Sequence, residues 1–230
     1  MLVDVAREAD RQKQIHVEVV TIYVPLASEQ PATIAFLQDW CLKMSGQLDA
    51  QLNRHALIAE IVRRFEQAHL RLGKTARQRI IFLLQRSSGV DAGYNYTLYT
   101  YGPFCADVAR DLDVVAAFGG VQISHELGCG GYHIQPGPAN DEIRECAAAF
   151  LEGLSNALER VVQDFGGLTA KDLELRSTIV CLAKPGMIRT ELIEQVHDVK
   201  PHFAPPAIAV AVRELEMQGY IDGLLEDARN

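Results

Sequence analysis

Glycine and proline residues that break secondary structure divide residues 51–230 into short segments, and their positions limit the fold more than any other sequence feature. Gly73, Gly119-Gly120 and Gly166-Gly167 each follow a run in which apolar residues recur at helical spacing. The expected helices are 52–70, 75–86, 104–118, 141–165, 169–183, 189–199 and 205–219. The sequence therefore predicts a mainly helical protein with short connections.

Short β segments interrupt these helices. Residues 94–101 alternate and are rich in tyrosine, which is typical of a strand, while 121–123 and 132–134 flank a glycine-rich turn. Three helices followed by a hairpin form a winged-helix arrangement, and the strand at 94–101 is placed to pair with that hairpin. Helices from 169 to 219 and a short strand at 220–222 repeat the pattern. The predicted class is α+β, mainly α with small β-hairpins, in two winged-helix-like units joined by a long helix.

The domain limits follow from the breakers. Pro136-Gly137-Pro138 closes a winged-helix-like domain with an extra strand at 51–138, a connecting helix fills 139–167, and a second winged-helix-like domain occupies 168–230. Residues 1–50 form an N-terminal extension, with a strand at 17–24 and a helix near 33–43. Residues 1–43 are interpreted either as an extension private to this protein or as the result of a start site placed too early.

The helix at 141–165 carries an apolar stripe at nearly heptad spacing. Such stripes usually face the core of their own chain. The alternative is a homodimer seam through 143–165. The stripe comprises Ile143, Ala147, Phe150, Leu154, Leu158, Val161 and Phe165.

Charge is unevenly distributed along the chain. The net charge is -8, yet residues 51–86 hold eight basic and two acidic residues, a net +6. This basic segment, 54–86, is suited to DNA phosphate, to an acidic partner, or to neutralising the protein's own acidic surface. The third helix of the first unit carries Asp107, Asp111 and Asp113, which disfavours reading a DNA groove. The candidate partner- or phosphate-binding residues are Arg63, Arg64, Arg71, Lys74, Arg77 and Arg79.

The tyrosines of segment 94–101 form a second candidate site. Strand alternation places Tyr94 and Tyr96 on one face and Tyr99 and Tyr101 on the other. One face is expected in the core and the other at a contact surface, because tyrosine is enriched in interface hot spots. With the Lys-Pro-His-Phe turn at 200–203, the candidate interface residues are Tyr96, Tyr99, Tyr101, Lys200 and His202.

Motifs for catalysis, metal or cofactor binding are weak. Gly73-Lys74-Thr75 lacks the earlier glycine and preceding strand of a phosphate-binding loop. His125, Cys129 and His133 have no C-x-x-C to support a zinc site, and the glycine-rich turn between them is explained by a hairpin. We expect no catalytic residues, metal or cofactor.

The five cysteines are odd in number and widely spaced, which predicts free thiols and a cytoplasmic protein. No signal peptide or membrane-spanning segment is evident at the N-terminus, and we expect no membrane partner.

Several motifs resemble those of a known family. These are Leu72-Gly73-Lys74-Thr75, the Tyr101-Gly102-Pro103-Phe104 turn, Arg110-Asp111-Leu112-Asp113, and Lys200-Pro201-His202-Phe203. Over about 52–221 the chain resembles the YwgA-like proteins of bacteria and is more distantly similar to Panacea and SocA-type domains. These relatives include antitoxin-type proteins and an adaptor that presents a partner for proteolysis. The resemblance therefore implies regulation through protein binding, and it brings no catalytic residues with it.

The first hypothesis is a non-enzymatic regulatory protein, antitoxin- or adaptor-like, that binds another protein. The alternative is a winged-helix transcriptional regulator that contacts DNA through segment 54–86. A weaker alternative is an enzyme acting on nucleic acid.

Overall fold

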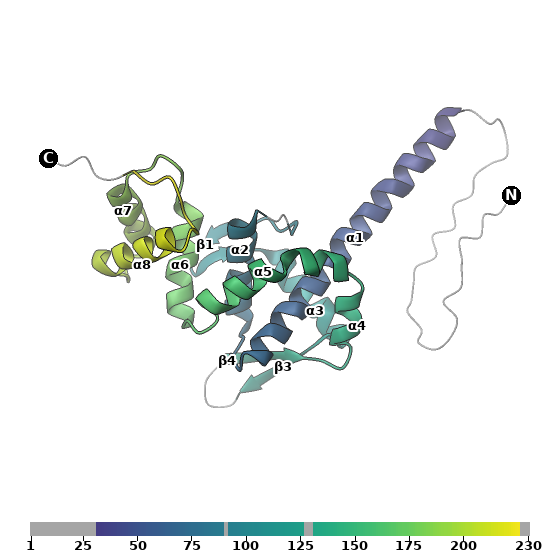
Figure 1. The fold of residues 1–230 in the computed structure, drawn as a ribbon, viewed down its shortest axis with the longest axis horizontal. Coiled ribbons are helices and arrows are strands. Elements are labelled where there is room, and N and C mark those ends of the chain that lie inside the picture. Colours follow the sequence, from purple (N-terminus) through teal and green to yellow (C-terminus); the bar gives the residue numbers. More distant parts are fainter. Residues whose placement is uncertain (1–30, 90–91, 127–130, 226–230) are drawn as a thin grey trace. The chain divides into compact units, whose positions relative to one another are not determined.

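The computed structural model describes residues 31–89, 92–126 and 131–225 (Figure 1). The chain divides into two compact units, 1–45 and 46–230. The predicted strand at 17–24 lies outside the described residues. The helix expected near 33–43 and the one expected at 52–70 are parts of a single helix, so the polar stretch at 45–47 does not interrupt it.

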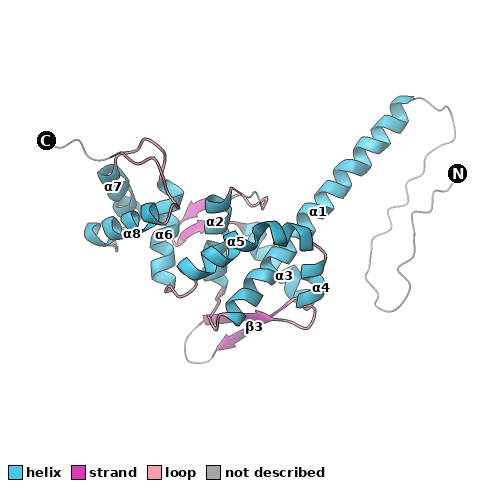
Figure 2. Cartoon of the chain, in the orientation of Figure 1, coloured by secondary structure: helices cyan, strands magenta, loops and turns pink. Residues whose placement is uncertain are grey.

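The described elements are mainly helical, with two small antiparallel sheets (Figure 2), which confirms the predicted α+β class. No further observation bears on the winged-helix units, which stay a prediction. In chain order the elements are α1 (Pro31–Gln67), α2 (Lys74–Ser88), β1 (Thr97–Tyr99), β2 (Gly102–Phe104), α3 (Ala106–Ala117), β3 (Val121–Glu126), β4 (Gly131–Pro136), α4 (Asn140–Glu145), α5 (Ala148–Phe165), α6 (Ala170–Leu182), α7 (Arg189–Val199) and α8 (Pro205–Met217).

Both sheets consist of one antiparallel pair. β3 pairs with β4, as the sequence predicted for this hairpin. β1 instead pairs with β2 across a two-residue turn, Thr100-Tyr101, so the prediction that segment 94–101 joins the β3–β4 hairpin is wrong. Gly102-Pro103 belongs to β2 because Gly102, at φ +102°, lets the chain reverse immediately after the turn. At 220–222 no strand is found, and a single bridge joins Ile188 to Leu225 nearby.

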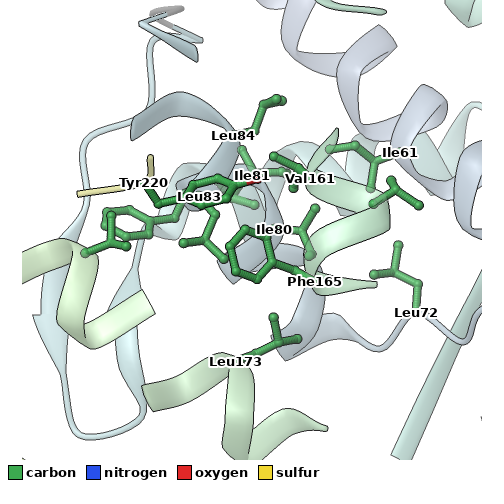
Figure 3. Close-up of a cluster of buried hydrophobic side chains, with 14 of the residues drawn as sticks. Ile61, Leu72, Ile80, Ile81, Leu83, Leu84, Val161, Phe165, Leu173 and Tyr220 are labelled. Atoms are coloured by element: carbon green, nitrogen blue, oxygen red, sulfur yellow. The ribbon is translucent and has the colours of Figure 1, made fainter. Parts of the chain in front are cut away.

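The main hydrophobic core, part of which is drawn in Figure 3, includes residues of α1, α2, α3, α5, α6, α7 and α8. α2 packs against both α5 and α6, and its Ile80, Ile81 and Leu83 are no more than 1% exposed. Phe165 from α5 is fully buried and stacks edge-on against Tyr220 at a centroid distance of 4.6 Å. Both predicted winged-helix segments, 51–138 and 168–230, contribute to this core.

The stripe on α5 faces this same core. Leu154, Leu158, Val161 and Phe165 are between 0 and 2% exposed within the single chain. A homodimer seam has to be accessible on the protomer, so these residues do not supply one, and the core-facing interpretation is confirmed.

The prediction of one long helix at 141–165 is wrong, because this segment forms two helices, α4 and α5. Ala147 leaves the helical region, at φ -136° and ψ 37°, between α4 and α5. No helix breaker marks this point, so tertiary contacts with α1 decide it. Asn140 donates from Nδ2 to the carbonyl oxygens of Ala59 (3.2 Å) and Gly120 (2.9 Å), while Arg144 donates to buried Glu60. These bonds orient α4 by α1 and override the local helical preference.

Among the residues that the structure describes, none of the helices combines the length and apolar character needed to cross a bilayer.

Candidate binding site

The candidate site is built from three consecutive polar residues of α2 that point inward. Arg77, Gln78 and Arg79 are 2, 6 and 3% exposed, although they lie within the most basic part of the sequence. Buried polar side chains need partners, because an unmet hydrogen bond in the interior costs free energy. Two of the three find theirs in the segment 97–105 that follows the helix.

We call residues 97–104 the aromatic hairpin. Each of its strands has three residues, and a hairpin of this size is marginal in water without support. Gln78 supplies one clamp: its Nε2 donates to the carbonyl oxygen of Cys105 (2.9 Å) and its Oε1 accepts from the Cys105 amide (3.1 Å). The Gln78 side chain thus bonds both backbone groups of Cys105, as a neighbouring strand would, at the residue that connects the hairpin to α3.

Two buried cations hold the turn of the aromatic hairpin. Arg79 donates from Nη2 to the carbonyl oxygen of Tyr101 (2.6 Å) and from Nη1 to that of Ala170 (2.6 Å). Lys200, 2% exposed, donates from Nζ to the carbonyl oxygen of Thr100. The two residues of the turn are therefore each fixed through the backbone by a different side chain.

Glu174 on α6 lies next to both cations and balances part of their charge. Its Oε1 lies 2.7 Å from Lys200 Nζ, and its Oε2 lies 3.9 Å from Arg79 Nη2. Gly102 packs onto the same helix so closely that an added Cβ would lie 3.3 Å from Ser177 Oγ. The Tyr-Gly-Pro and Lys-Pro-His-Phe turns, about 100 residues apart in sequence, therefore meet around one buried carboxylate.

The aromatic side chains of the hairpin remain outside. Tyr99, Tyr101 and Phe104 are 61, 73 and 40% exposed, and the rings of Tyr99 and Phe104 meet edge-on at 5.5 Å. Large exposed aromatic groups on a rigid support are typical of protein-binding surfaces. The fold fixes the backbone of this turn and leaves its rings accessible.

A pocket of about 510 Å³ lies beside these rings, and we call it the Arg77 pocket. Its volume is within the range of small-ligand sites. Its lining is largely aromatic and aliphatic, with three basic residues and one carboxylate. The lining residues include Lys74, Arg77, Arg79, Tyr99, Tyr101, Pro103, Phe104, Leu112 and Asp113.

Arg77 is the unusual member of this pocket. Its Nε and Nη1 are buried and have no hydrogen-bond partner within the described part of the chain. Burial lowers the pKa of Arg77 to about 10, and the charges of Tyr94, Tyr96, Asp113 and Asp111 only partly oppose this. A desolvated guanidinium without a hydrogen-bonded anion is costly, so Arg77 is placed to donate hydrogen bonds to an anion that enters the pocket.

The nearby Asp111 does not serve as that anion. Its carboxylate accepts a hydrogen bond from the Tyr94 hydroxyl (3.0 Å) and forms an ion pair with Arg54 (Nε–Oδ2 3.0 Å). Burial raises the pKa of Asp111, but hydrogen bonds from His55 and Tyr94 and the charge of Arg54 outweigh it and lower the pKa. Asp111 is therefore an ionised, already neutralised group of the interior.

The other predicted basic residues are mostly engaged. Arg63 and Arg64 both donate to Glu60, at 2.6 to 2.9 Å. Burial raises the pKa of Glu60, but its hydrogen bonds with Arg63, Arg64 and Arg144 lower it to about 2. These two arginines of the basic segment therefore neutralise an acidic group of the same chain.

Lys74 and Arg71 lie in the middle of the same segment, where the loop after α1 leads into α2. Lys74 begins α2 and places its ammonium 4.4 Å from the centre of the Tyr132 ring on β4. Arg71 is exposed in the loop before it. The six predicted basic residues are thus divided among a Glu60 cluster, the hairpin support, the pocket and this loop, and do not form one stripe.

The predicted interface residues also do not form one group: some are exposed and others are buried. Tyr99 and Tyr101 lie on the exposed rim, as the alternation predicted for one face. Tyr96 is half-buried against Phe82 (5.2 Å between ring centres), and Lys200 is buried under the turn, so neither is presented at the surface. His202 is half exposed, with Nε2 3.6 Å from Glu174 Oε1.

Sequence reasoning missed Gln78, Glu174, Phe104 and Asp113. Glu174 gave only a weak signal: it lies between Leu173 and Leu175, but Asp172 and Arg176 flank these leucines, so the sequence does not single it out.

Within the described ranges, no three His, Cys, Asp or Glu side chains gather to hold a metal ion, and Cys129 lies outside those ranges. Cys105, Cys146 and Cys181 are free thiols.

Comparison of the chain with protein-family models finds no match, and comparison with curated proteins finds none either.

Proposed function

We propose that this chain is a non-enzymatic regulatory protein, of antitoxin or adaptor type, that binds another protein through the aromatic hairpin. The observation that carries the proposal is the support of the turn. Two buried cations, Arg79 and Lys200, bind the backbone carbonyls of Tyr101 and Thr100, while the ring of Tyr101 is 73% exposed. Because burying cations is expensive, a structure of this kind is expected where a surface must be held in one conformation.

Rigid aromatic groups favour association in two ways. They contribute a large apolar area, and little conformational freedom is lost when the partner covers them. The resemblance to YwgA-like proteins points to the same class of function. The DNA-binding alternative receives less support, because Arg63, Arg64 and Arg79 are engaged inside the protein.

The test is a comparison of variants in affinity capture from cells that express the protein. A double variant, Tyr99→Ser with Tyr101→Ser, is compared with wild type and with Phe118→Ser. Phe118 is a matched control because it is 61% exposed and lies outside the hairpin. We expect a specific partner that is retained by wild type and Phe118→Ser and lost by the double variant. Equal recovery by all three proteins would contradict the proposal.

A further inference from the structure

The Arg77 pocket has the charge and the shape to recognise one chemical group. Three basic residues and one acidic residue line it, which gives a net positive charge. Arg79 is already bound to the carbonyl oxygens of Tyr101 and Ala170, so its position is fixed. Arg77 has two buried donors, Nε and Nη1, without a hydrogen-bond partner among the described residues, whereas Arg79 has one, its Nε. Arg77 is 98% buried beside the cavity.

From these contacts we infer that the Arg77 pocket binds the carboxylate of an aspartate or glutamate side chain in an apolar segment of the partner. The inference rests on the proposed function, since the pocket and the exposed rings of Tyr99 and Tyr101 form one surface. The carboxylate accepts hydrogen bonds from the Arg77 guanidinium, while Lys74 adds a second positive charge.

A carboxylate suits this pocket better than a phosphate. Asp113, exposed on α3, lines the same cavity and repels an anion in proportion to its charge. A doubly charged phosphate also costs more to remove from water into this largely aromatic and aliphatic lining than a singly charged carboxylate does.

The surroundings of the pocket favour a side chain over a chain terminus. Tyr99, Tyr101 and Phe104 are exposed next to the cavity and offer apolar area to residues that flank the acid. An internal acidic residue has neighbours on both sides to cover this area, whereas a C-terminal carboxylate has a neighbour on one side only.

The test uses end-blocked synthetic peptides as probes, measured by isothermal titration calorimetry on the full chain. The peptides are acetyl-Leu-Phe-Asp-Phe-Leu-amide, the same peptide with Asn in place of Asp, and acetyl-Leu-Phe-Leu-Phe with a free C-terminus. Inorganic phosphate is a fourth probe. We expect the Asp peptide to bind at least about tenfold tighter than the Asn peptide, because a charge-assisted hydrogen bond is lost.

Two variants of opposite effect make the assignment specific. Arg77→Met should remove the preference for Asp over Asn, whereas Arg86→Met, on the exposed part of the same helix, should keep it. Asp113→Asn should tighten binding of the Asp peptide severalfold, because it removes a like charge from the pocket.

The inference is overturned by equal binding of the Asp and Asn peptides, including no detectable binding of either at millimolar concentration. It is also overturned if phosphate or the free C-terminus binds more tightly, or if Arg77→Met leaves the preference unchanged. Partner capture that depends on Tyr99 and Tyr101 would survive any of these results, so failure of the carboxylate site is distinguishable from failure of the proposed function.

Discussion

Replacing Arg77 by methionine should make the free protein more stable. Arg77 Nε and Nη1 are buried without a hydrogen-bond partner in the described structure, and the side chain is 2% exposed. Methionine keeps an unbranched side chain of similar reach and removes the charge. The usual expectation for a substitution in the interior is a loss of stability, so a gain would be a specific signature of an unmet charge.

The size of the effect follows from the pKa of Arg77. Burial lowers this pKa from 12.5 to about 10, and each unit corresponds to 1.36 kcal/mol between the two protonation states. The penalty for the charged form is therefore about 3 kcal/mol. It is fully present below pH 10 and fades as the pH rises from about 10 towards 12.5, because the folded protein releases its proton first.

The assay is urea denaturation at pH 7, with calorimetry for the melting temperature. We expect Arg77→Met to raise the free energy of unfolding by about 2–3 kcal/mol and the melting temperature by roughly 5–10 °C. Arg86→Met is the control, since its side chain is exposed on the same helix, and its effect should stay within about 0.5 kcal/mol. A variant at Arg77 that is less stable than wild type would mean that the guanidinium is satisfied in the free protein, and the reasoning would fail.

Three further changes test the packing around the site. Glu60→Gln should lower the free energy of unfolding by about 3 kcal/mol at pH 7, because the pKa of Glu60 is lowered from 4.5 to about 2. In denaturation curves this loss of stability should shrink as the pH falls from 4.5 towards 2, whereas the control Glu66→Gln, at an exposed residue, should change the stability by close to zero. Lys200→Met should destabilise the protein by about 3–5 kcal/mol, because Glu174 is left buried without its main partner. It should also speed amide hydrogen exchange in the hairpin, and unchanged exchange at Thr100 and Tyr101 would refute the role of Lys200 in holding the turn. Leu154→Asp should unfold the protein, because Leu154 lies in the core and is 2% exposed. A folded variant with an altered mass in light scattering would instead support a homodimer seam through 143–165.

The sequence predicts most of the helices well, because their limits are local. Gly73 precedes α2, Pro205 begins α8, and Arg189–Val199 forms α7 at the predicted residues. Where tertiary contacts decide, local pattern fails. Ala147 breaks a helix that has no breaker in its sequence, since α4 is held by Asn140 and Arg144 against α1.

The site was predictable in its parts but not in its arrangement. The alternation of tyrosines separates buried Tyr94 from exposed Tyr99 and Tyr101, although only part of the segment forms a strand. The basic segment reads as a surface, but Arg77 and Arg79 turn inward. That direction depends on partners far away in sequence, such as Ala170 and Glu174, which no local pattern reveals.

The central claim is that the aromatic hairpin contacts a protein partner, and site-specific photocrosslinking tests it most directly. A photoreactive phenylalanine placed at Tyr101 should yield one discrete adduct in cells that express the protein. The same group at Phe118, which is 61% exposed and lies outside the hairpin, should yield none. If neither position gives an adduct, or both give the same one, the hairpin is not the contact surface and the account is contradicted.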